Sequence, residues 1–593
     1  MCPDLNLHPV VIDADRPGDL NWIYQADAAL RPASIDLEDL PIAVDWSRKR
    51  MLWMIYGSCH LDLIASVMAR ITDCSEVVVL ESESVDAYGL EPDERDGLIQ
   101  WILNERLTII AGGSLMQRVQ KLIELVDINR LDGWKPLLSK TLMSRRPEET
   151  QKLFEQLGAG INSKIMSKGT YLTVAQHYFR NTLINAPLVS EGGVLSRWSD
   201  ARKDRPVLVV SAGPSLNKQL PLLAENQDLF TILAVNTVWP ILKKHGIVPD
   251  VMLALDRNSK AAWPVNSVSP DTAFFVDLGC APRLMWSHDH NHMITTCDPV
   301  TSAIAGALGA STEYLRTGGS VATSAFALAE VLGANPIVFI GQDLALTDGK
   351  DHAEGYPHTY NANTLKNRTD NGFDVDGYHG GRVRTERQLM YYKTWFERRA
   401  SELTDRLIIN ATEGGARING TVQLPFATVC REIQATRLRK TPLMPPTPTR
   451  IDPAHMAKLS HNLVTLCKDV QEFRKIATEA RALCRRMGGR PSQKQLKRLD
   501  RLNQRIRQED PISKTIVNLM GLKKFEAIRY KTHTGQGMDD IKDAIDKYDE
   551  VYQNIETGAE TALKMLEDMG RFYQRVAERG EIALDLLDEI DPA

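Results

Sequence analysis

Short apolar runs separated by helical stretches characterise the chain up to about residue 115. The runs that predict buried strands lie at 51–57, 76–81 and 106–112. A helical pattern lies between the first two, and this strand–helix–strand order is typical of a parallel sheet. The segment 116–200 then has apolar residues at helical spacing. We therefore expect residues 1–200 to form a Rossmann-like N-terminal domain with a helical connector.

The strand–helix alternation becomes stronger over residues 201–440. Each predicted strand is a short apolar run bounded by polar residues, glycine or proline, and these runs lie at 207–210, 231–235, 250–255, 272–276 and 336–340. The pattern predicts a central doubly wound, Rossmann-like sheet in an α/β multidomain protein. In such sheets, ligands bind at the carboxyl ends of the strands.

A proline-rich linker over 441–453 marks a change of period. Asp452 and Pro453 suit the cap and first turn of a helix, and apolar residues then recur every three or four positions until Gly488-Gly489. Two more long helical patterns follow. Residues 441–593 should form an all-α C-terminal domain, which would hold a partner or serve in oligomerisation.

Composition narrows the class of protein. The chain is 43% hydrophobic and 25% charged with a net charge of −5, so a nucleic-acid partner is not expected. Its eight cysteines show no CxxC spacing, which argues against a disulfide framework or a zinc site. No apolar run reaches the roughly 18 residues that a membrane span needs, and no signal sequence is recognisable, so we expect a cytoplasmic protein.

The turn after the strand at 207–210 is the strongest local signal. A buried strand ends at Ser211, turns through Gly213-Pro214-Ser215 and enters a helix. The glycine lets the backbone approach a ligand, and the start of the helix favours an anion. Taken alone, the same turn would also serve as a tight strand-to-helix connection.

Polar residues end the next two strands as well. Asn236 and Thr237 follow one strand, and Asp256 follows the next. Loop caps are the alternative explanation. Three consecutive strand ends with such side chains favour a ligand pocket, because parallel strands bring these ends to one edge.

A second glycine-rich entry into a helix lies at 317–330. Its turn contains Gly318, Gly319, Ser320 and Thr323. Backbone N–H groups and hydroxyls of this kind suit a phosphate. Close packing of small residues against a sheet would explain the same composition.

The strand at 336–340 leads directly into Gln342 and Asp343, which should project into the same crevice. A loop from about 348 to 385 follows, with little regular pattern and with His352, His358 and His379. One of these histidines would serve as general base, although histidines in long loops are usually solvated. A further glycine-rich turn contains Thr412 and Glu413.

Several well-known motifs are absent from the sequence. It has no GxxxxGK[ST], GxSxG or HExxH motif and no carboxylate-rich metal motif. In the N-terminal part, Tyr56-Gly57-Ser58 and Glu81 imitate a dinucleotide site, but the glycine repeat is missing.

The order of these motifs resembles that of the motility accessory factor (Maf) family of bacterial flagellin glycosyltransferases. The matching segments, over about residues 200–425, are SAGPSL, AVNT, DVMLALD, TGGSVATSAFALAEVLGANPIVFIGQDLALTDGKDHA and INATEGGARINGT. The central domain is also similar to archaeal hydroxymethylpterin pyrophosphokinases and, more distantly, to bacterial sialyltransferases that use CMP-sugars.

The resemblance implies transfer of a nonulosonic acid, such as pseudaminic or legionaminic acid, from its CMP-activated form to Ser or Thr of flagellin. In the sialyltransferase-like interpretation, Gly213, Pro214 and Ser215 border the nucleotide, and Asn236 contacts the donor. The product would be the modified flagellin needed for flagellum assembly and motility.

The same interpretation assigns roles to later residues. Ser320 and Thr323 match the turn near the cytidine and phosphate, and Asp343 matches the acid of the GxD element. The general base would be His352, with His358 as the alternative. No cofactor is required because CMP is a good leaving group. A divalent metal, held by Asp256 or Asp343, is compatible with the scheme but not needed.

Two other functions remain open at this stage. The same crevice in a 6-hydroxymethylpterin pyrophosphokinase would bind ATP and a pterin. A flagellin-binding chaperone would need no working pocket at all, although the intact SAGPSL, GQD and TEGG elements disfavour it.

Overall fold

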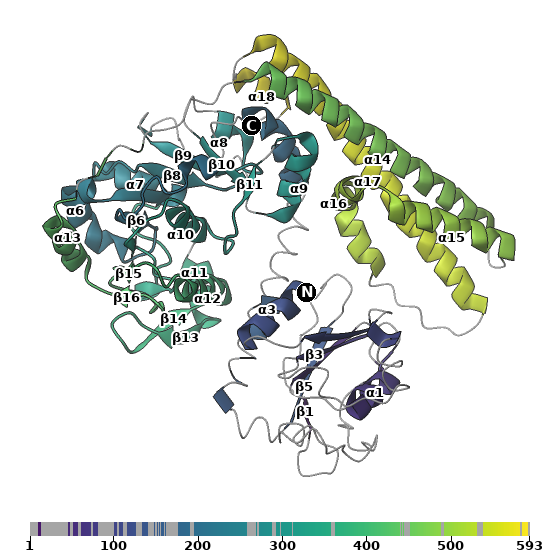
Figure 1. Cartoon of the computed structure of the whole chain (residues 1–593), viewed down its shortest axis with the longest axis horizontal. Helices are drawn as coiled ribbons and strands as arrows, with labels where there is room; N and C mark the ends of the chain where they lie inside the picture. The colour runs from purple at the N-terminus through teal and green to yellow at the C-terminus, as the bar shows by residue number, and fades with distance from the viewer. Residues whose placement is uncertain are drawn as a thin grey trace. The chain divides into compact units, whose positions relative to one another are not determined.

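A computed structural model gives the fold (Figure 1). It describes residues 176–189, 195–257, most of 268–310, then 312–356, 362–438, 451–487, 491–529, 538–580 and 584–590, together with shorter segments before residue 170. The chain forms two compact units, Met1–Thr170 and Tyr171–Ala593. None of the described helices is long and apolar enough to cross a membrane.

The first unit contains a five-stranded parallel sheet in the order β1-β5-β2-β3-β4. Its strands are β1 (Val10–Ile12), β2 (Met51–Tyr56), β3 (Glu76–Leu80), β4 (Leu107–Ile110) and β5 (Gly133–Ser139), with helices α1 (Leu61–Arg70) and α3 (Leu115–Leu125). The three strands predicted from apolar runs are confirmed. Of the N-terminal dinucleotide-like motif, Gly57, Ser58 and Glu81 lie outside the described residues.

Strand β5 is a correction to the sequence analysis, which expected 116–200 to be mostly helical. Its sequence, GWKPLLS, has neither the alternation nor the unbroken apolar run of a typical strand. It forms because it pairs with β1 on one side and β2 on the other. Tertiary pairing thus overrides weak local preference.

The second unit is built on a nine-stranded parallel sheet in the order β11-β10-β9-β8-β7-β6-β12-β15-β16. The strands are β6 (Val207–Val210), β7 (Thr231–Val235), β8 (Val251–Ala254), β9 (Ala273–Asp277), β10 (His292–Thr296), β11 (Glu313–Tyr314), β12 (Ile337–Ile340), β15 (Ile408–Asn410) and β16 (Val422–Gln423). The predicted doubly wound sheet is confirmed. Strand order reverses between β6 and β12, which pair directly. That is the switch point at which such sheets bind ligands.

Helices cover both faces of this sheet. One face packs against α6 (Leu216–Asn226), α7 (Trp239–Lys244), α8 (Pro282–Trp286), α9 (Pro299–Leu308) and α13 (Phe426–Ala435), and the other against α10 (Val321–Val331) and α12 (Arg387–Glu402). In β6, Leu208 and Val210 belong to the first core, while Val207 and Val209 belong to the second. Burial on both faces explains why these strands are continuous apolar runs.

The segment predicted to be an irregular loop, about 348–385, contains regular structure. Helix α11 (Ala362–Asp370) is followed by the antiparallel hairpin β13 (Phe373–Asp376) and β14 (Arg382–Thr385). We call residues 362–385 the excursion. The hairpin strands are largely exposed and carry charge pairs such as Arg382–Asp376 at 2.7 Å. They therefore lack the hydrophobic alternation by which strands are recognised.

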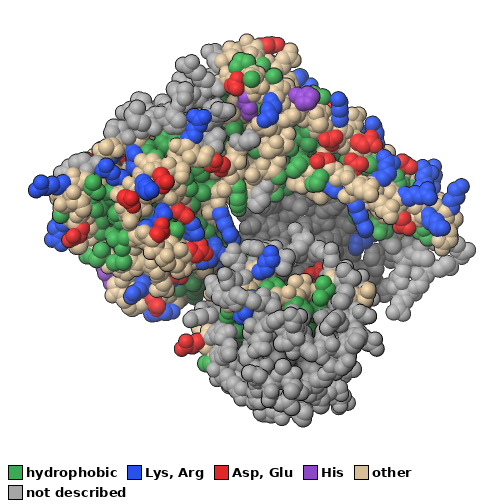
Figure 2. All heavy atoms as spheres, in the orientation of Figure 1, with side chains coloured by type: hydrophobic (Ala, Val, Ile, Leu, Met, Phe, Trp, Pro, Cys, Tyr) green, Lys and Arg blue, Asp and Glu red, His purple; other side chains and the backbone are tan. Residues whose placement is uncertain are grey.

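The C-terminal part is helical, as predicted. It comprises α14 (Pro453–Met487), α15 (Gln493–Gln508), α16 (Pro511–Arg529), α17 (Met538–Arg579) and α18 (Leu584–Ile590). The Asp452 carboxylate accepts the Ala454 N–H at 3.0 Å, as expected of a helix cap. Helices α14 and α17 lie side by side (Figure 1). We call α14–α18 the helical arm. Acidic and basic side chains are interspersed along it in Figure 2, and Arg481 of α14 pairs with Glu556 of α17.

The helical part shares a core with the sheet. A helix over residues 176–185 and the turn η4 (Ala186–Leu188) lie between them, and apolar side chains of α14 and α17 belong to the same cluster as Leu183 and Ile184. Residues 171–200 and 441–593 therefore belong to one compact unit with the central domain, although their sequence patterns set them apart.

Tyr573 on α17 provides a test of this shared core. Its hydroxyl donates to the Leu183 carbonyl at 2.6 Å, and both groups are buried. The usual intrahelical donor to that carbonyl would come from residue 187, which is proline and has no N–H. Tyr573→Phe should therefore lower the free energy of unfolding by about 1–2 kcal/mol.

Chemical denaturation of Tyr573→Phe and of the parent protein would check this prediction. The dependence of the free energy of unfolding on denaturant concentration should also be compared between them. Tyr548→Phe, at an exposed tyrosine, is the matched control and should change stability by less than about 0.5 kcal/mol. Equal stabilities for Tyr573→Phe and the parent protein would contradict the prediction.

Candidate functional site at the carboxyl edge of the sheet

Three turns meet at the switch point, one after each of β6, β12 and β15. The Gly213 N–H donates to the Gly341 carbonyl at 2.8 Å. A Cβ at Gly213 would lie 2.2 Å from Asp343 Oδ1, and one at Gly414 would lie 1.9 Å from Ser215 Oγ. Glycine is needed at these positions because the side chains of Ser215 and Asp343 fill the space that a Cβ would occupy. SAGPSL, GQD and TEGG thus converge on one edge.

Asp343 lies at the centre of this contact. It is 2% exposed, and its carboxylate accepts the Ser215 hydroxyl at 2.6 Å, the Ser215 N–H at 3.1 Å and the Thr347 hydroxyl at 2.7 Å. Burial raises the pKa of Asp343 above its usual range, although these hydrogen bonds oppose the shift. The carboxylate therefore occupies the start of α6, the position at which the sequence suggests an external anion.

A second chain of hydrogen bonds connects the same three turns. The Ser211 hydroxyl donates to Gln342 Oε1 at 2.7 Å, and the Gln342 N–H donates to the Thr412 hydroxyl at 3.2 Å. All three side chains are at least nine-tenths buried, and Pro214 is buried beside them. These predicted site residues form a rigid floor, which we define as Ser211–Ser215, Gly341–Asp343 and Thr412–Gly415.

Asn236 and Asp256 extend the edge beyond this floor. Asn236 Nδ2 lies 3.3 Å from Asp256 Oδ2, so the ends of β7 and β8 are in contact. Asn236 is 6% exposed, yet its Oδ1 has no hydrogen-bond partner among the described residues. A buried amide oxygen of this kind is costly unless a ligand or water donates to it. The neighbouring Thr237 is half-buried.

The start of α10 reaches the same edge, because this helix runs back from the carboxyl to the amino ends of the strands. Ser320 and Thr323 form a capping box. Trp395 of α12 covers Gly318, and Gly319 is exposed. The N–H groups of Val321 and Ala322 in the first turn have no partner in the described structure. Donors of this kind suit an anion.

His352 is brought to the floor by the segment after β12. The neighbouring Ala353 N–H donates to the Ala212 carbonyl at 2.8 Å, and the Glu354 N–H donates to Asn217 Oδ1 at 3.2 Å. The imidazole Nδ1 lies 3.2 Å from Asp351 Oδ2, within ion-pair distance but outside hydrogen-bond geometry. The alternative base, His358, lies outside the described residues.

Glu413 and the residues after it support the turn that follows β15. The Glu413 carboxylate accepts the Phe426 N–H at 3.0 Å. Burial and, to a lesser extent, the charge of Glu413 raise the pKa of Tyr378 to about 12. The excursion folds onto this turn, because the Tyr378 N–H donates to the Gly415 carbonyl at 2.9 Å. His379 of the excursion contacts the Glu413 carbonyl.

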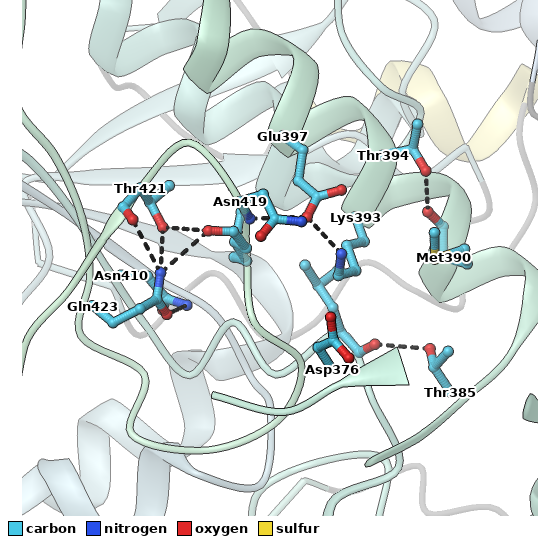
Figure 3. A network of polar contacts seen from close by, with 12 residues as sticks. Asp376, Thr385, Met390, Lys393, Thr394, Glu397, Asn410, Asn419, Thr421 and Gln423 are labelled. Carbon is cyan, nitrogen blue, oxygen red and sulfur yellow. Dashed lines mark hydrogen bonds and ion pairs between the residues drawn. The ribbon is translucent and has the colours of Figure 1, made fainter. Parts of the chain in front are cut away.

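A polar network then fixes the chain between the TEGG turn and β16 (Figure 3). The buried Lys393 of α12 donates to Glu397 at 2.5 Å, and the same Glu397 oxygen accepts the Asn419 N–H at 2.8 Å. Gln423 contacts Asn410 at 2.9 Å. Asn410 joins this network to the floor, because its Oδ1 accepts the Thr412 N–H at 3.2 Å.

Sequence reasoning missed the residues that come from the connector helix. Asn181 Nδ2 donates to the carbonyls of Arg257 and Gly279, each at 3.1 Å. The Arg257 guanidinium lies 3.2 Å from the centre of the Tyr178 ring. No motif marks Tyr178 and Asn181, because they lie on an ordinary amphipathic helix far from the strands in sequence. Within the described residues, no group of three His, Cys, Asp or Glu side chains could hold a metal ion.

Comparison with known proteins places this edge in context. Residues 180–349 match the family model for 6-hydroxymethylpterin diphosphokinase MptE-like proteins. A solved structure, the MAf glycosyltransferase from Magnetospirillum magneticum AMB-1, aligns with a TM-score of 0.53 and 16% identity, covering 91% of this chain and 82% of that one. The fold resembles that of a Maf glycosyltransferase. The likeness inferred from the motifs is thereby confirmed for the fold and for the central segment.

A third similarity is short. Over 49 residues the chain is 33% identical to an uncharacterized protein of Treponema pallidum (strain Nichols), a stretch that is 8% of this chain and 23% of that protein. The Maf-like fold and the MptE-like match over residues 180–349 therefore give the useful comparisons, and both include strands of the switch-point sheet.

Proposed function

We propose that the protein is a glycosyltransferase that moves a nonulosonic acid of the pseudaminic or legionaminic type from its CMP-activated form to Ser or Thr of flagellin. The observation that carries the proposal is the hydrogen bond between Ala353 and Ala212, which brings His352 to the switch point. Because Asp351 lies at Nδ1, a proton on that nitrogen leaves Nε2 to act as a base.

The chemistry requires three things that this edge supplies. The acceptor hydroxyl attacks the anomeric carbon, its proton passes to His352, and the bond from that carbon to the phosphate oxygen breaks to release CMP. The free N–H groups at the start of α10 would bind the phosphate. Asn236 and Asp256 would contact the cytidine, to which the unpartnered Oδ1 of Asn236 can accept a hydrogen bond.

In this scheme Asp343 supports the site and does not take part in the chemistry. Its carboxylate is already engaged by Ser215 and Thr347. No cofactor enters the reaction, since CMP leaves readily without one. The helical arm would help to hold the protein acceptor, whose own helical segments could pair with amphipathic helices.

A pyrophosphokinase is the second candidate, because residues 180–349 match the MptE-like family model. In that case the same edge would bind ATP and 6-hydroxymethylpterin, and AMP would be released. The long helical arm, which a small-molecule kinase does not need, favours the protein acceptor.

One experiment separates these functions. The protein is incubated with flagellin and CMP-pseudaminic acid or CMP-legionaminic acid, and separately with ATP and 6-hydroxymethylpterin. Mass spectrometry then records intact flagellin and the pterin. We expect a sugar increment on flagellin that His352→Asn reduces by at least about 100-fold.

His245→Asn, at an exposed histidine after α7, is the matched control and should leave the increment unchanged. His358→Asn tests the alternative base. A diphosphorylated pterin with unmodified flagellin would instead establish the kinase, and full activity of His352→Asn would remove His352 from the mechanism.

A further inference from the structure

Arg368 of α11 lies between two carboxylates from different segments. Its Nη1 lies 2.9 Å from Asp351 Oδ2, while its Nε and Nη2 donate to the two oxygens of Glu386 at 3.0 and 2.6 Å. The side chains of Asp351, Arg368 and Glu386 are 8%, 21% and 19% exposed. A planar guanidinium is suited to such a two-sided contact, because its donors point in fixed directions.

The same oxygen of Asp351 also faces the imidazole. Asp351 Oδ2 lies 3.2 Å from His352 Nδ1. Burial by itself would raise the pKa of Asp351, but the close contact with His352 and the charges of His352 and Arg368 outweigh it and lower that pKa. Asp351 is therefore a carboxylate at neutral pH, shared between a guanidinium and an imidazole.

We propose that Arg368 is a positioning residue that fixes the orientation and tautomer of His352 through Asp351. The inference rests on the proposed function in that it takes His352 as the general base. Arg368 belongs to the excursion, and Glu386 stands just before α12. Among the described residues, the excursion thus acts on the base through Asp351.

The other groups near the imidazole have different roles. The Tyr356 ring stacks on His352, with centroids 4.1 Å apart and planes 14° apart, and so fixes the plane of the imidazole. Lys350 and Glu354, each two positions from His352 in sequence, pair with each other at 2.9 Å and are exposed. Asp351 is the charged group that contacts Nδ1, and Arg368 contacts Asp351 in turn.

Substitutions at the two ends of this chain should change which imidazole nitrogen carries the proton. Asp351→Asn removes the carboxylate at Nδ1 and should favour the tautomer with the proton on Nε2. Arg368→Gln removes the cation that holds Asp351 and should mix the two tautomers. Arg368→Lys keeps a cation beside Asp351 and should restore part of the parent protein's tautomer preference.

The experiment is an NMR measurement, at mildly alkaline pH, of the full-length protein labelled with ¹⁵N in its histidine rings. His352→Asn assigns the signal, and the ring nitrogen shifts report which nitrogen carries the proton. Arg382→Gln is the matched control, because Arg382 lies on the same excursion but pairs with the exposed Asp376. It should leave the tautomer unchanged.

The outcomes separate this inference from the proposed function. An unchanged tautomer in Arg368→Gln, with normal thermal unfolding, would overturn the positioning role even if the enzyme transfers sugar. Conversely, mixed tautomers in Arg368→Gln would support it even if transfer fails.

Discussion

Removal of residues 441–593 is expected to leave a chain that no longer folds cooperatively, although the proline-rich linker at 441–453 looks like a domain boundary. Side chains of α14 and α17 pack on the central part. Trp286 of α8, for example, meets Phe572 at 5.5 Å between ring centroids. Asn462 of α14 also donates to the Leu308 carbonyl at 3.0 Å.

The magnitude follows from burial. Exposing one large apolar side chain costs about 1.5–3 kcal/mol, and a typical domain has only about 5–15 kcal/mol of stability. Leu183, Ile184, Trp286 and Leu308 are all buried in the cluster that the helical arm completes. Exposing even these four side chains to water would remove most of the free energy of unfolding of the remaining chain.

Urea denaturation and amide hydrogen exchange of the truncated chain would measure the effect. The matched comparison is removal of residues 1–170, the other compact unit. That change should leave a protein with a cooperative transition. A soluble fragment 1–440 that unfolds in one sharp transition would contradict the expectation.

Asp343→Ala is expected to lower the free energy of unfolding by about 2–4 kcal/mol. It leaves the buried N–H and hydroxyl of Ser215 without their acceptor and opens a space where three turns meet. Loss of sugar transfer in this variant would therefore report a damaged floor. It would not identify Asp343 as a catalytic acid.

Asp343→Asn is the informative partner of that variant. Its amide keeps an acceptor for the Ser215 N–H and adds a donor for the Thr347 hydroxyl, so it should cost about 1 kcal/mol or less at neutral pH. Denaturation curves together with transfer rates would compare the two. Similar stabilities for both variants, or a stable but inactive Asn variant, would argue against a supporting role.

The pH dependence gives this comparison a sign. Because burial raises the pKa of Asp343 in the folded state, ionisation of this carboxyl costs stability as the pH rises from about 4, its unfolded value, through the folded value. Asp343→Asn has no group that ionises there. The free energy of unfolding of the parent protein should therefore exceed that of Asp343→Asn by more below this pH window than above it.

The sheet could be predicted where the chain is apolar on both faces. β6 and β7 have the bounds read from the sequence, since VLVV and TILAV are buried throughout. β10 and the hairpin β13–β14 could not, because HMITT begins and ends with polar residues and the hairpin is charged. Such strands are defined by their partners in the fold, and a single sequence does not contain those partners.

The candidate site shows a similar division. Because parallel strands end at one edge, the meeting of SAGPSL, GQD and TEGG could be predicted. The role of Asp343 could not be predicted. A carboxylate at a strand end can face a ligand or a neighbouring turn, and the packing of the turns decides which. Asp351 and Arg368 also escaped notice, because seventeen residues of sequence separate two groups that share an oxygen contact.

The glycine-packed floor has a consequence for how specificity can change. Turns that are already fixed by packing lose little conformational entropy when a ligand binds. They also tolerate few substitutions, because a Cβ at Gly213 or Gly414 meets a neighbour within about 2.2 Å. Under the proposed function, substitutions that change the donor preference should therefore lie at Asn236, Asp256 and the first turn of α10, outside the floor.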